Sequence, residues 1–240
     1  MSEFMRICGL NKTTLLDYPG HVAATVFTGG CNFRCPYCHN SDLVLAPGNI
    51  QEIPGQELEA FLTKRKGVLQ GICITGGEPT LQGDLAEFIR WVKGFGYLVK
   101  LDTNGYRPLV LEKLLQEQLL DYVAMDIKAS KENYSLAVGM DVELEAIEES
   151  VRLLLGSKIP YEFRTTVVKG IHRIEEFEQI GQWLAGADAY YLQAYRENEK
   201  ELMRVTGIER VFGTFSKTEM EQMQALAQKY ISMVGIRGLD

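Results

Sequence analysis

Short apolar stretches typical of β-strands alternate with helical periodicity along almost the whole chain. The helical pattern is clearest where Leu85, Phe88 and Val92 recur at intervals of three and four residues. Strands joined by helices run parallel, because each right-handed crossover returns the chain to the start of the next strand. Such a sheet is buried on both faces, and it either stays open and doubly wound or curls toward a barrel. The predicted strands are residues 22–28, 71–75, 97–102, 121–127, 160–168 and 188–194.

The same kind of pattern predicts the helices, and no linker divides the six βα units. We therefore expect one domain over residues 1–240. Residues 197–215 are polar and weakly patterned, which favours a mobile or partner-facing loop before a C-terminal helix. Helices are expected at about 55–66, 85–92, 107–118, 144–154, 173–185 and 217–230.

Charge and hydropathy exclude several function classes. The 240 residues carry a net charge of −7, with lysine and arginine scattered along the sequence, so nothing predicts attraction to nucleic acid or anionic lipid. No apolar run approaches the roughly 20 residues that span a bilayer, and the first residues lack a charged-then-apolar leader. We expect a cytoplasmic protein that binds neither nucleic acid nor membranes.

The unusual polar and glycine-rich segments all follow or end predicted strands. In parallel α/β folds, the loops at the carboxyl ends of the strands build the functional site. The first strand runs into a cysteine loop at 29–40, while Arg164 and Gln193 lie on the fifth and sixth strands. This convergence on one edge of the sheet predicts a single site there. The other segments are Gly76-Gly77-Glu78-Pro79, Asp102-Thr103-Asn104-Gly105, and Asp126 with Lys128.

Three of the five cysteines, Cys31, Cys35 and Cys38, fall within eight residues. In a cytosolic chain this spacing indicates a metal centre and not disulfides. Structural zinc needs four ligands, usually from two separate pairs, whereas three thiolates on one compact loop suit three corners of a four-iron cube. The fourth iron would then be open to a substrate or cofactor. A zinc site completed by His39 is the alternative, although neighbouring side chains reach one ion with difficulty.

Together these motifs resemble the radical S-adenosylmethionine superfamily over residues 20 to 195. The spacing Cys-x3-Cys-x2-Cys after one strand and Gly-Gly-Glu-Pro after the next carry the resemblance. Within the superfamily the chain is similar to the glycyl-radical-enzyme activases. It is most similar to the activating protein of anaerobic ribonucleoside-triphosphate reductase, with pyruvate formate-lyase activating enzyme a near relative. The shared segments are Tyr37-Cys38-His39-Asn40, Gly76-Gly77-Glu78-Pro79-Thr80, Asp102-Thr103-Asn104-Gly105, Met125-Asp126-Ile127-Lys128 and Arg164.

The resemblance implies an α/β fold, a partial (β/α)6 barrel with parallel strands and outer helices. It implies one 4Fe-4S cluster on Cys31, Cys35 and Cys38, with S-adenosylmethionine bound at the open iron. Reductive cleavage would give a 5′-deoxyadenosyl radical that abstracts a hydrogen atom from a glycine of a partner glycyl radical enzyme, anaerobic ribonucleotide reductase above all. Reduced flavodoxin or ferredoxin would donate the electron. The protein would supply positioning and electrostatics, with no catalytic side chain beyond the cluster and cofactor.

Several residues around the cofactor also take roles from the resemblance. Tyr37 would cover the cluster or touch adenine, unless it only packs within its loop. Gly76 and Gly77 would bring backbone groups to the methionyl amine, an approach that a Cβ atom would obstruct. Glu78 belongs to the same cofactor-binding turn.

Two acidic residues end the third and fourth predicted strands. Asp102 and Asp126 would complement the cationic sulfonium and amine of the cofactor. Together with Thr103, they match residues that bind a monovalent cation in the pyruvate formate-lyase activase. Here Met125 is displaced by one position from that pattern, so Ala124 would supply the backbone carbonyl to such a cation.

Two basic residues have two interpretations each. Lys128 and Arg164 lie on otherwise apolar strands, where a buried charge needs a partner. They would contact the methionyl carboxylate or ribose, or else form structural ion pairs with Asp102 or Asp126. Gln193 takes the equivalent position on the sixth strand and would also bind the cofactor.

Other functions remain open at this stage. A radical enzyme acting on a small molecule, such as 7-carboxy-7-deazaguanine synthase, has a similar short barrel. That family shows Trp before the third cysteine and Asp-Thr after it, where this chain has Tyr37 and His39-Asn40. The partner of an activase could also be a different glycyl radical enzyme. An iron–sulfur electron carrier or zinc-bound interaction module would need a fourth cysteine at cluster spacing, whereas Cys8 and Cys73 are remote and predicted to be core residues.

Overall fold

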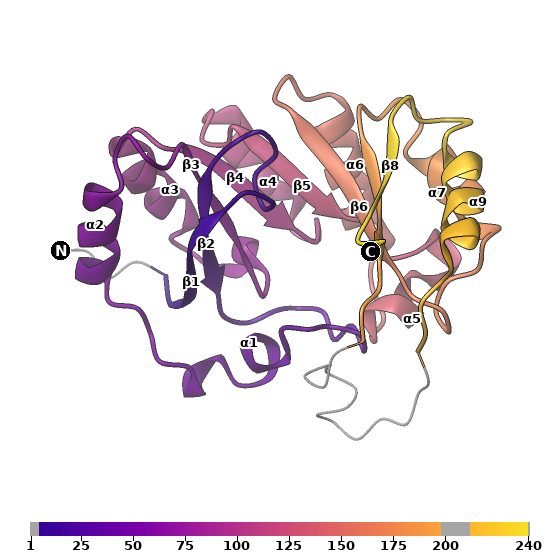
Figure 1. Cartoon of the computed structure of the whole chain (residues 1–240), viewed down its shortest axis with the longest axis horizontal. Coiled ribbons are helices and arrows are strands. Elements are labelled where there is room, and N and C mark those ends of the chain that lie inside the picture. The colour runs from indigo at the N-terminus through magenta and orange to yellow at the C-terminus, as the bar shows by residue number, and fades with distance from the viewer. Residues whose placement is uncertain (1–4, 198–211, 240) are drawn as a thin grey trace.

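The computed structural model describes residues 5–197 and 212–239, so most of the predicted loop at 197–215 lies outside the described residues. The described strands form one sheet, ordered as in the sequence (Figure 1). β1 and β2 pair antiparallel, and each later pair of neighbours is parallel. The sheet is not closed, because β1 and β8 form its two edges. The strands are β1 (Ile7–Thr14), β2 (Ala23–Thr28), β3 (Gly71–Gly76), β4 (Leu98–Thr103), β5 (Tyr122–Asp126), β6 (Tyr161–Val167), β7 (Tyr190–Ala194) and β8 (Val234–Arg237).

The predicted partial barrel of parallel strands with outer helices is confirmed. β2 to β7 coincide with the six predicted strands, and β1 and β8 extend the sheet by one strand at each edge. β8 is not among the predicted strands, because four residues are too few to show a period of two. It pairs parallel with β7 nevertheless.

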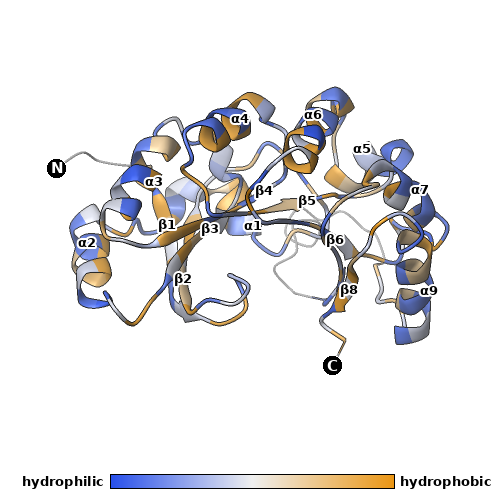
Figure 2. Ribbon diagram, turned by 90° about the horizontal axis from the view of Figure 1, so that it is seen from above, coloured by the Kyte–Doolittle hydropathy of each residue, from blue (hydrophilic) through white to orange (hydrophobic). Residues whose placement is uncertain are grey.

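The longer helices cover one face of the curved sheet (Figure 2). The apolar side chains predicted at helical spacing face the core in α3, where Phe88, Ile89 and Val92 are fully buried. α9 starts with a capping box between Ser216 and Glu219. No helix in the described part of the chain is long and apolar enough to cross a lipid bilayer. The helices are α1 (Ser41–Leu45), α2 (Gly55–Lys64), α3 (Leu85–Gly94), α4 (Pro108–Gln116), α5 (Tyr134–Val138), α6 (Leu144–Leu155), α7 (Glu176–Trp183) and α9 (Lys217–Ala227), with 3₁₀ turns at Pro47–Asn49, Pro79–Leu81 and Lys131–Asn133.

The two faces of the sheet differ in chemistry because side chains alternate along each strand. In β4, Val99 and Leu101 are fully buried in the apolar core that the sheet shares with the helices. Lys100 and Asp102 point to the opposite side, which we call the inner face. Polar side chains that the register aligns on this face include Thr25, Cys73, Lys100, Asp102, Tyr122, Asp126, Glu162, Arg164 and Arg237.

The last strand is attached to the sheet by an ion pair on the inner face. Arg237 of β8 donates two hydrogen bonds of 2.8 Å to the carboxylate of Glu162 on β6, a side chain that is only 1% exposed. The Arg237 guanidinium also stacks 3.3 Å from the centre of the Tyr191 ring. A buried carboxylate needs such a partner, so β8 is positioned by charge as well as by its backbone hydrogen bonds.

Candidate functional site

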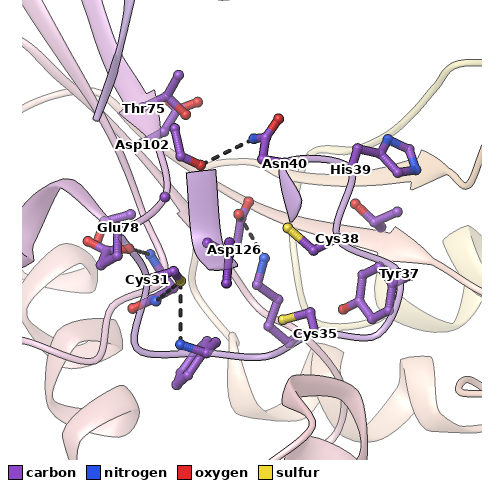
Figure 3. A pocket seen from close by; sticks show the side chains of 18 residues that line it. Cys31, Cys35, Tyr37, Cys38, His39, Asn40, Thr75, Glu78, Asp102 and Asp126 are labelled. Atoms are coloured by element: carbon purple, nitrogen blue, oxygen red, sulfur yellow. Dashed lines mark hydrogen bonds and ion pairs between the residues drawn. The ribbon is translucent and has the colours of Figure 1, made fainter. Parts of the chain in front are cut away.

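A cavity of about 220 Å³ lies at the carboxyl ends of the parallel strands. Figure 3 shows the three cysteines of one loop around the same space as Asp126. The wall contains the predicted site residues Cys31, Cys35, Tyr37, Cys38, Gly76, Gly77, Glu78, Asp102, Thr103, Asp126 and Lys128. It also contains Phe33, His39, Asn40, Val44, Thr75, Asn104 and Thr166. Of the predicted residues, Arg164 and Gln193 do not line this cavity.

The cysteine loop leaves β2 through a sharp change of direction. Gly30 has a φ of +83°, a conformation that glycine adopts without strain, and its N–H donates to Leu43 O at 2.7 Å. Further on, Cys38 N donates to Cys35 O at 3.0 Å, closing a turn that brings these two cysteines together. The loop therefore follows a path fixed by its own backbone hydrogen bonds.

A distant segment also holds the cysteine loop in place. Arg34 N donates to the carbonyl oxygen of Val138, the last residue of helix α5, at 2.9 Å. Gly139 follows with a φ of +71°, and a Cβ atom there would lie 2.3 Å from Arg34 O. The Arg34 guanidinium donates to the carbonyls of Cys31 and Phe33 at 2.7 and 2.8 Å. These contacts fix the spacing of the first two cysteines.

Burial dominates the ionisation of the three thiols. It raises the pKa of Cys31 to about 11 and of Cys35 to about 12, and it also raises the pKa of Cys38. The Lys128 ammonium acts in the opposite direction on all three thiols. Phe33 N also donates to Cys31 Sγ at 3.4 Å. The thiols are therefore protonated at neutral pH unless a metal centre takes the place of the protons.

Gly76 and Gly77 allow the loop after β3 to lie directly on the backbone of the cysteine loop. At Gly76, with a φ of +116°, a Cβ atom would lie 2.5 Å from both N and O of Thr28. At Gly77 it would lie 1.9 Å from Gly30 O. The two loops are joined by hydrogen bonds from Gly77 N to Thr28 O and from Glu78 N to Gly30 O, at 2.9 and 2.8 Å. Close contact between two protein loops is thus enough to explain why glycine is required at both positions, in addition to any approach to a cofactor.

Glu78 connects the loops after β3 and β4 from a fully buried position. Its Oε1 accepts from Thr103 Oγ1 at 2.7 Å and from Thr80 N at 3.0 Å, and its Oε2 accepts from Asn104 N at 2.7 Å. Burial raises the pKa of this carboxyl, and the hydrogen bonds only partly oppose that rise. Because these donors belong to the protein, Glu78 fixes the shape of the cavity wall.

A chain of ion pairs crosses the inner face beside the cavity. Arg164 donates to Asp102 Oδ2 at 3.1 Å through NH1 and to Asp126 Oδ1 at 3.0 Å through Nε. Lys128 Nζ donates to Asp126 Oδ2 at 3.0 Å. Although burial opposes ionisation, Arg164 and Lys128 lower the pKa of Asp126 to about 2, and Arg164 with Lys100 lowers that of Asp102. The ion pairs of Lys128 and Arg164 with Asp102 and Asp126, which the sequence allows as the alternative to cofactor contacts, are therefore present. Lys128 also lines the cavity.

Comparison with known proteins assigns this arrangement to a family. A sequence model described as the Radical SAM superfamily matches residues 25–184, which include the cysteine loop and the carboxyl ends of β2 to β6. The chain belongs to the radical SAM superfamily. Radical SAM proteins use a 4Fe-4S cluster and S-adenosylmethionine, so both cofactors are implied for this enzyme.

Full-length relatives place the chain near the activating enzymes. A Methanocaldococcus jannaschii protein that is named as a glycyl-radical enzyme activating enzyme is 31% identical over 98% of this chain and 96% of its own length. The pyruvate formate-lyase-activating enzyme of Clostridium pasteurianum is 29% identical over 77% of this chain and 85% of its own. The Escherichia coli K12 pyruvate formate-lyase 1-activating enzyme is 28% identical over 89% of this chain and 98% of its own.

Solved structures support the fold alone. Streptococcus suis SuiB superposes with a TM-score of 0.66 and 13% identity, over 88% of this chain and 47% of that one. A structure of anSMEcpe with bound AdoMet gives a TM-score of 0.58 and 18% identity, over 87% of this chain and 62% of that one. The radical SAM barrel is thus retained while the sequence has diverged.

The residues of this radical SAM protein fit the implied cluster. Three soft thiol donors, Cys31, Cys35 and Cys38, come from one preformed loop and face a common cavity. Among residues 5–197 and 212–239, no three His, Cys, Asp or Glu side chains gather around a point that a single metal ion could occupy. The wall also carries the Tyr37 hydroxyl, which is buried and has no hydrogen-bond partner among those residues. Its ring meets that of Phe212 edge-on at 6.5 Å.

Lys100 is a charged residue of this region that we did not predict from the sequence. It is 1% exposed, and its ammonium donates to Asp102 Oδ1 and lies 3.8 Å from Cys73 Sγ. Its signal is present in the sequence, because a cation on an apolar strand needs a buried partner and Asp102 follows two residues later on the same face. The same reasoning identifies Lys128 and Arg164.

Asn104 is a second residue missing from the predicted site. Its Nδ2 donates to Asn32 Oδ1 at 2.9 Å and lies 3.9 Å from Cys31 Sγ. The residue stands inside the Asp102–Gly105 motif, but nothing in the sequence shows which member of the motif faces the cysteines. Asn104 thereby connects the loop after β4 to the first cysteine.

His172 supports the cavity from outside its wall. Val168 N donates to Nδ1 at 3.0 Å, so Nε2 carries the proton and donates to Lys128 O at 2.8 Å. Burial lowers the pKa of this imidazole, which favours the neutral form that both bonds require. The backbone of Lys128 is thus fixed just beyond the end of β5.

Gln193 lies on β7 in register with Thr166 and Arg237. Thr166 lines the cavity and Gln193 does not, so the structure leaves the predicted contact between Gln193 and the cofactor as a prediction. Cys8 and Cys73 are both buried, as predicted for core residues.

Proposed function

We propose that this radical SAM enzyme is an activase for a glycyl radical enzyme. One observation carries the proposal: three thiols on a preformed loop share a cavity with Lys128 and two ionised carboxylates, at the edge of a sheet that is not closed. The similarity to full-length activating enzymes supports the same assignment. Anaerobic ribonucleotide reductase is the proposed partner, because the motifs of this chain resemble those of its activating protein.

Cys31, Cys35 and Cys38 would hold the 4Fe-4S cluster in this proposal. When bound, the reduced cluster and S-adenosylmethionine supply a 5′-deoxyadenosyl radical that takes a hydrogen atom from a glycine Cα. The Lys128 ammonium, which favours thiolate over thiol at each cysteine, assists their ligation. Reduced flavodoxin or ferredoxin is the proposed electron donor.

The cavity wall would orient S-adenosylmethionine through fixed charges. Asp102 and Asp126 are ionised and complement the positive sulfonium and amine, while Lys128 faces the methionyl carboxylate. Gly76 and Gly77 line the cavity and would present backbone groups to the amine, and Tyr37 would offer its hydroxyl, which has no hydrogen-bond partner among the described residues. Arg164 and Glu78 act through neighbouring residues, because their own bonds are made within the protein.

The open sheet accounts for a protein substrate. β1 and β8 do not pair with each other, so within the described residues the sheet is open between its edge strands, unlike a closed eight-stranded barrel. An extended polypeptide loop can enter such an opening, and a glycine on that loop can reach the cavity at the strand ends. We infer that the hydrogen donor is a backbone glycine of another chain.

A spectroscopic experiment tests the proposal. The anaerobically reconstituted protein is mixed with S-adenosylmethionine, dithionite and separate candidate glycyl radical enzymes, and each mixture is examined by electron paramagnetic resonance. We expect a glycyl doublet in anaerobic ribonucleotide reductase and methionine release in the same sample.

The Cys35→Ala variant is the control, and we expect it to release no methionine and produce no doublet. Cofactor cleavage without a doublet in any candidate would contradict the activase function and favour a small-molecule substrate of the 7-carboxy-7-deazaguanine synthase kind. A doublet confined to pyruvate formate-lyase would reassign the partner alone.

A further inference from the structure

A cluster of ion pairs lies on the inner face next to the cavity. Three cations, Lys100, Arg164 and Lys128, surround the two carboxylates Asp102 and Asp126. Lys100 is the most deeply buried of them, with 1% of its side chain exposed, against 14% for Arg164 and 19% for Lys128. It does not line the cavity, and it reaches the site only through Asp102.

Each carboxylate oxygen in this group already has a donor from the protein. Asp102 Oδ1 accepts from Lys100 and lies 3.6 Å from Cys73 Sγ, while Asp102 Oδ2 accepts from Arg164. Asp126 Oδ1 and Oδ2 accept from Arg164 and Lys128. Each of these oxygens is therefore hydrogen-bonded without any ion from solution.

A metal cation bound at these carboxylates would meet like charges at short range. Repulsion between cations is strong where water is excluded, and a metal ion would also have to displace an existing donor from Asp102 or Asp126. A buried ammonium is costly unless it is paired, so an apolar residue would be the simpler choice at position 100 if only packing mattered.

We infer that Lys100 is a positioning residue that serves as a built-in cation for Asp102, so that S-adenosylmethionine binds without a monovalent metal ion. The inference rests on the proposed function, since it concerns the same cofactor site. It differs from the expectation of a cation bound by Asp102, Thr103 and Asp126. Lys100 holds the Asp102 carboxylate in place and supplies the charge that such an ion would otherwise bring.

The test measures S-adenosylmethionine binding to the reconstituted holoprotein by isothermal titration calorimetry. Titrations are done at one ionic strength in choline chloride, sodium chloride and potassium chloride. The wild-type dissociation constant should differ by less than twofold among the three salts. Lys100→Met should bind at least tenfold more weakly in choline chloride, and sodium or potassium should restore part of that loss.

Two further variants separate positioning from folding. Lys100→Arg keeps the charge, and its affinity for S-adenosylmethionine should not depend on the salt. Lys93→Met removes a lysine of α3 that pairs with Asp121 at 2.6 Å away from the cavity, and it should bind S-adenosylmethionine like the wild type in every salt. If Lys100→Met fails to fold, the salt series on the wild type and on Lys100→Arg decides the question.

The possible failures are distinct. If the wild type binds S-adenosylmethionine at least tenfold more tightly in sodium or potassium chloride than in choline chloride, the role of Lys100 is overturned and the activase function is left intact. Equal affinity of Lys100→Met and wild type in choline chloride would do the same. A wild-type holoprotein that binds no S-adenosylmethionine in any salt would overturn the proposed function itself, and this inference with it.

Discussion

Two neighbouring residues of β4, one on each face of the sheet, are almost equally buried but are stabilised by different forces. Leu101, facing the helices, is fully buried, and Lys100, next to it on the inner face, is 1% exposed. Burial of the Leu101 side chain away from water stabilises the fold, and many apolar neighbours make the same kind of hydrophobic contribution. Lys100 depends on one carboxylate with a fixed position. Burial alone therefore does not separate core from site, whereas the type of partner does.

Among the variants that test this comparison, Arg164→Met should cause the largest loss of stability. This change leaves Asp102 and Asp126 without the guanidinium that both share, while both remain on the inner face. We expect a loss of about 4 kcal/mol in unfolding free energy, roughly 10 °C in Tm, because each buried carboxylate loses one of its two cationic partners and keeps only Lys100 or Lys128. Chemical denaturation of wild type and variant measures it. A loss under about 1 kcal/mol would show that the pairs are screened by water.

Leu101→Ala probes the outer face of the same strand. We expect a loss of about 3 kcal/mol, since the change leaves a cavity among the residues packed against α3. Affinity for S-adenosylmethionine should stay within about twofold of the wild type, because the side chain does not face the site. Stability by denaturation and binding by calorimetry are compared on one preparation. Strongly weakened binding would mean that the two faces are coupled.

Acid titration sharpens the contrast further. The ion pairs lower the pKa of Asp126 to about 2, below its ordinary value of 3.8. This carboxylate therefore contributes stability at neutral pH that is lost as pH falls from about 4 to about 2, about 2 kcal/mol in all. Asp126→Asn should show a smaller decline over that interval, whereas Leu101→Ala should decline as the wild type does. Parallel curves for Asp126→Asn and wild type would contradict the assignment.

The smallest effect is expected at His172. Burial lowers its pKa from 6.5, so the unfolded chain takes up a proton before the folded protein does, and stability falls as pH drops below about 6.5. His172→Gln loses the acceptor for Val168 N and should cost about 1 kcal/mol at pH 8. It should also reduce the slope of stability between pH 7 and 5, measured by denaturation. An unchanged slope would mean that another group titrates there.

The sequence predicts the framework better than the connections within it. β2 to β7 and the convergence of their loops follow from periodicity and from the geometry of parallel sheets. α1, α5 and β8 have four or five residues each, too few to show a period. The sharing of Arg164 between Asp102 and Asp126 depends on the register of three strands, which no local pattern contains.

The glycine pair shows the same limit. That Gly76 and Gly77 are needed follows from the sequence, but the atoms that exclude a Cβ there are Thr28 N and O and Gly30 O. Those contacts arise only when two loops from adjacent strands are folded against each other. The motif identifies where space is limited, and only the structure identifies what limits it.

The support that Val138 and Gly139 give to Arg34 has a consequence for maturation. Since the cysteine loop takes its shape from a segment about a hundred residues further along the chain, that shape is complete only once β5 and α5 have folded. We therefore expect the loop to be ready for a cluster only after the chain has folded at least as far as Gly139. Stripping the metal with a chelator should leave the far-ultraviolet circular dichroism spectrum unchanged.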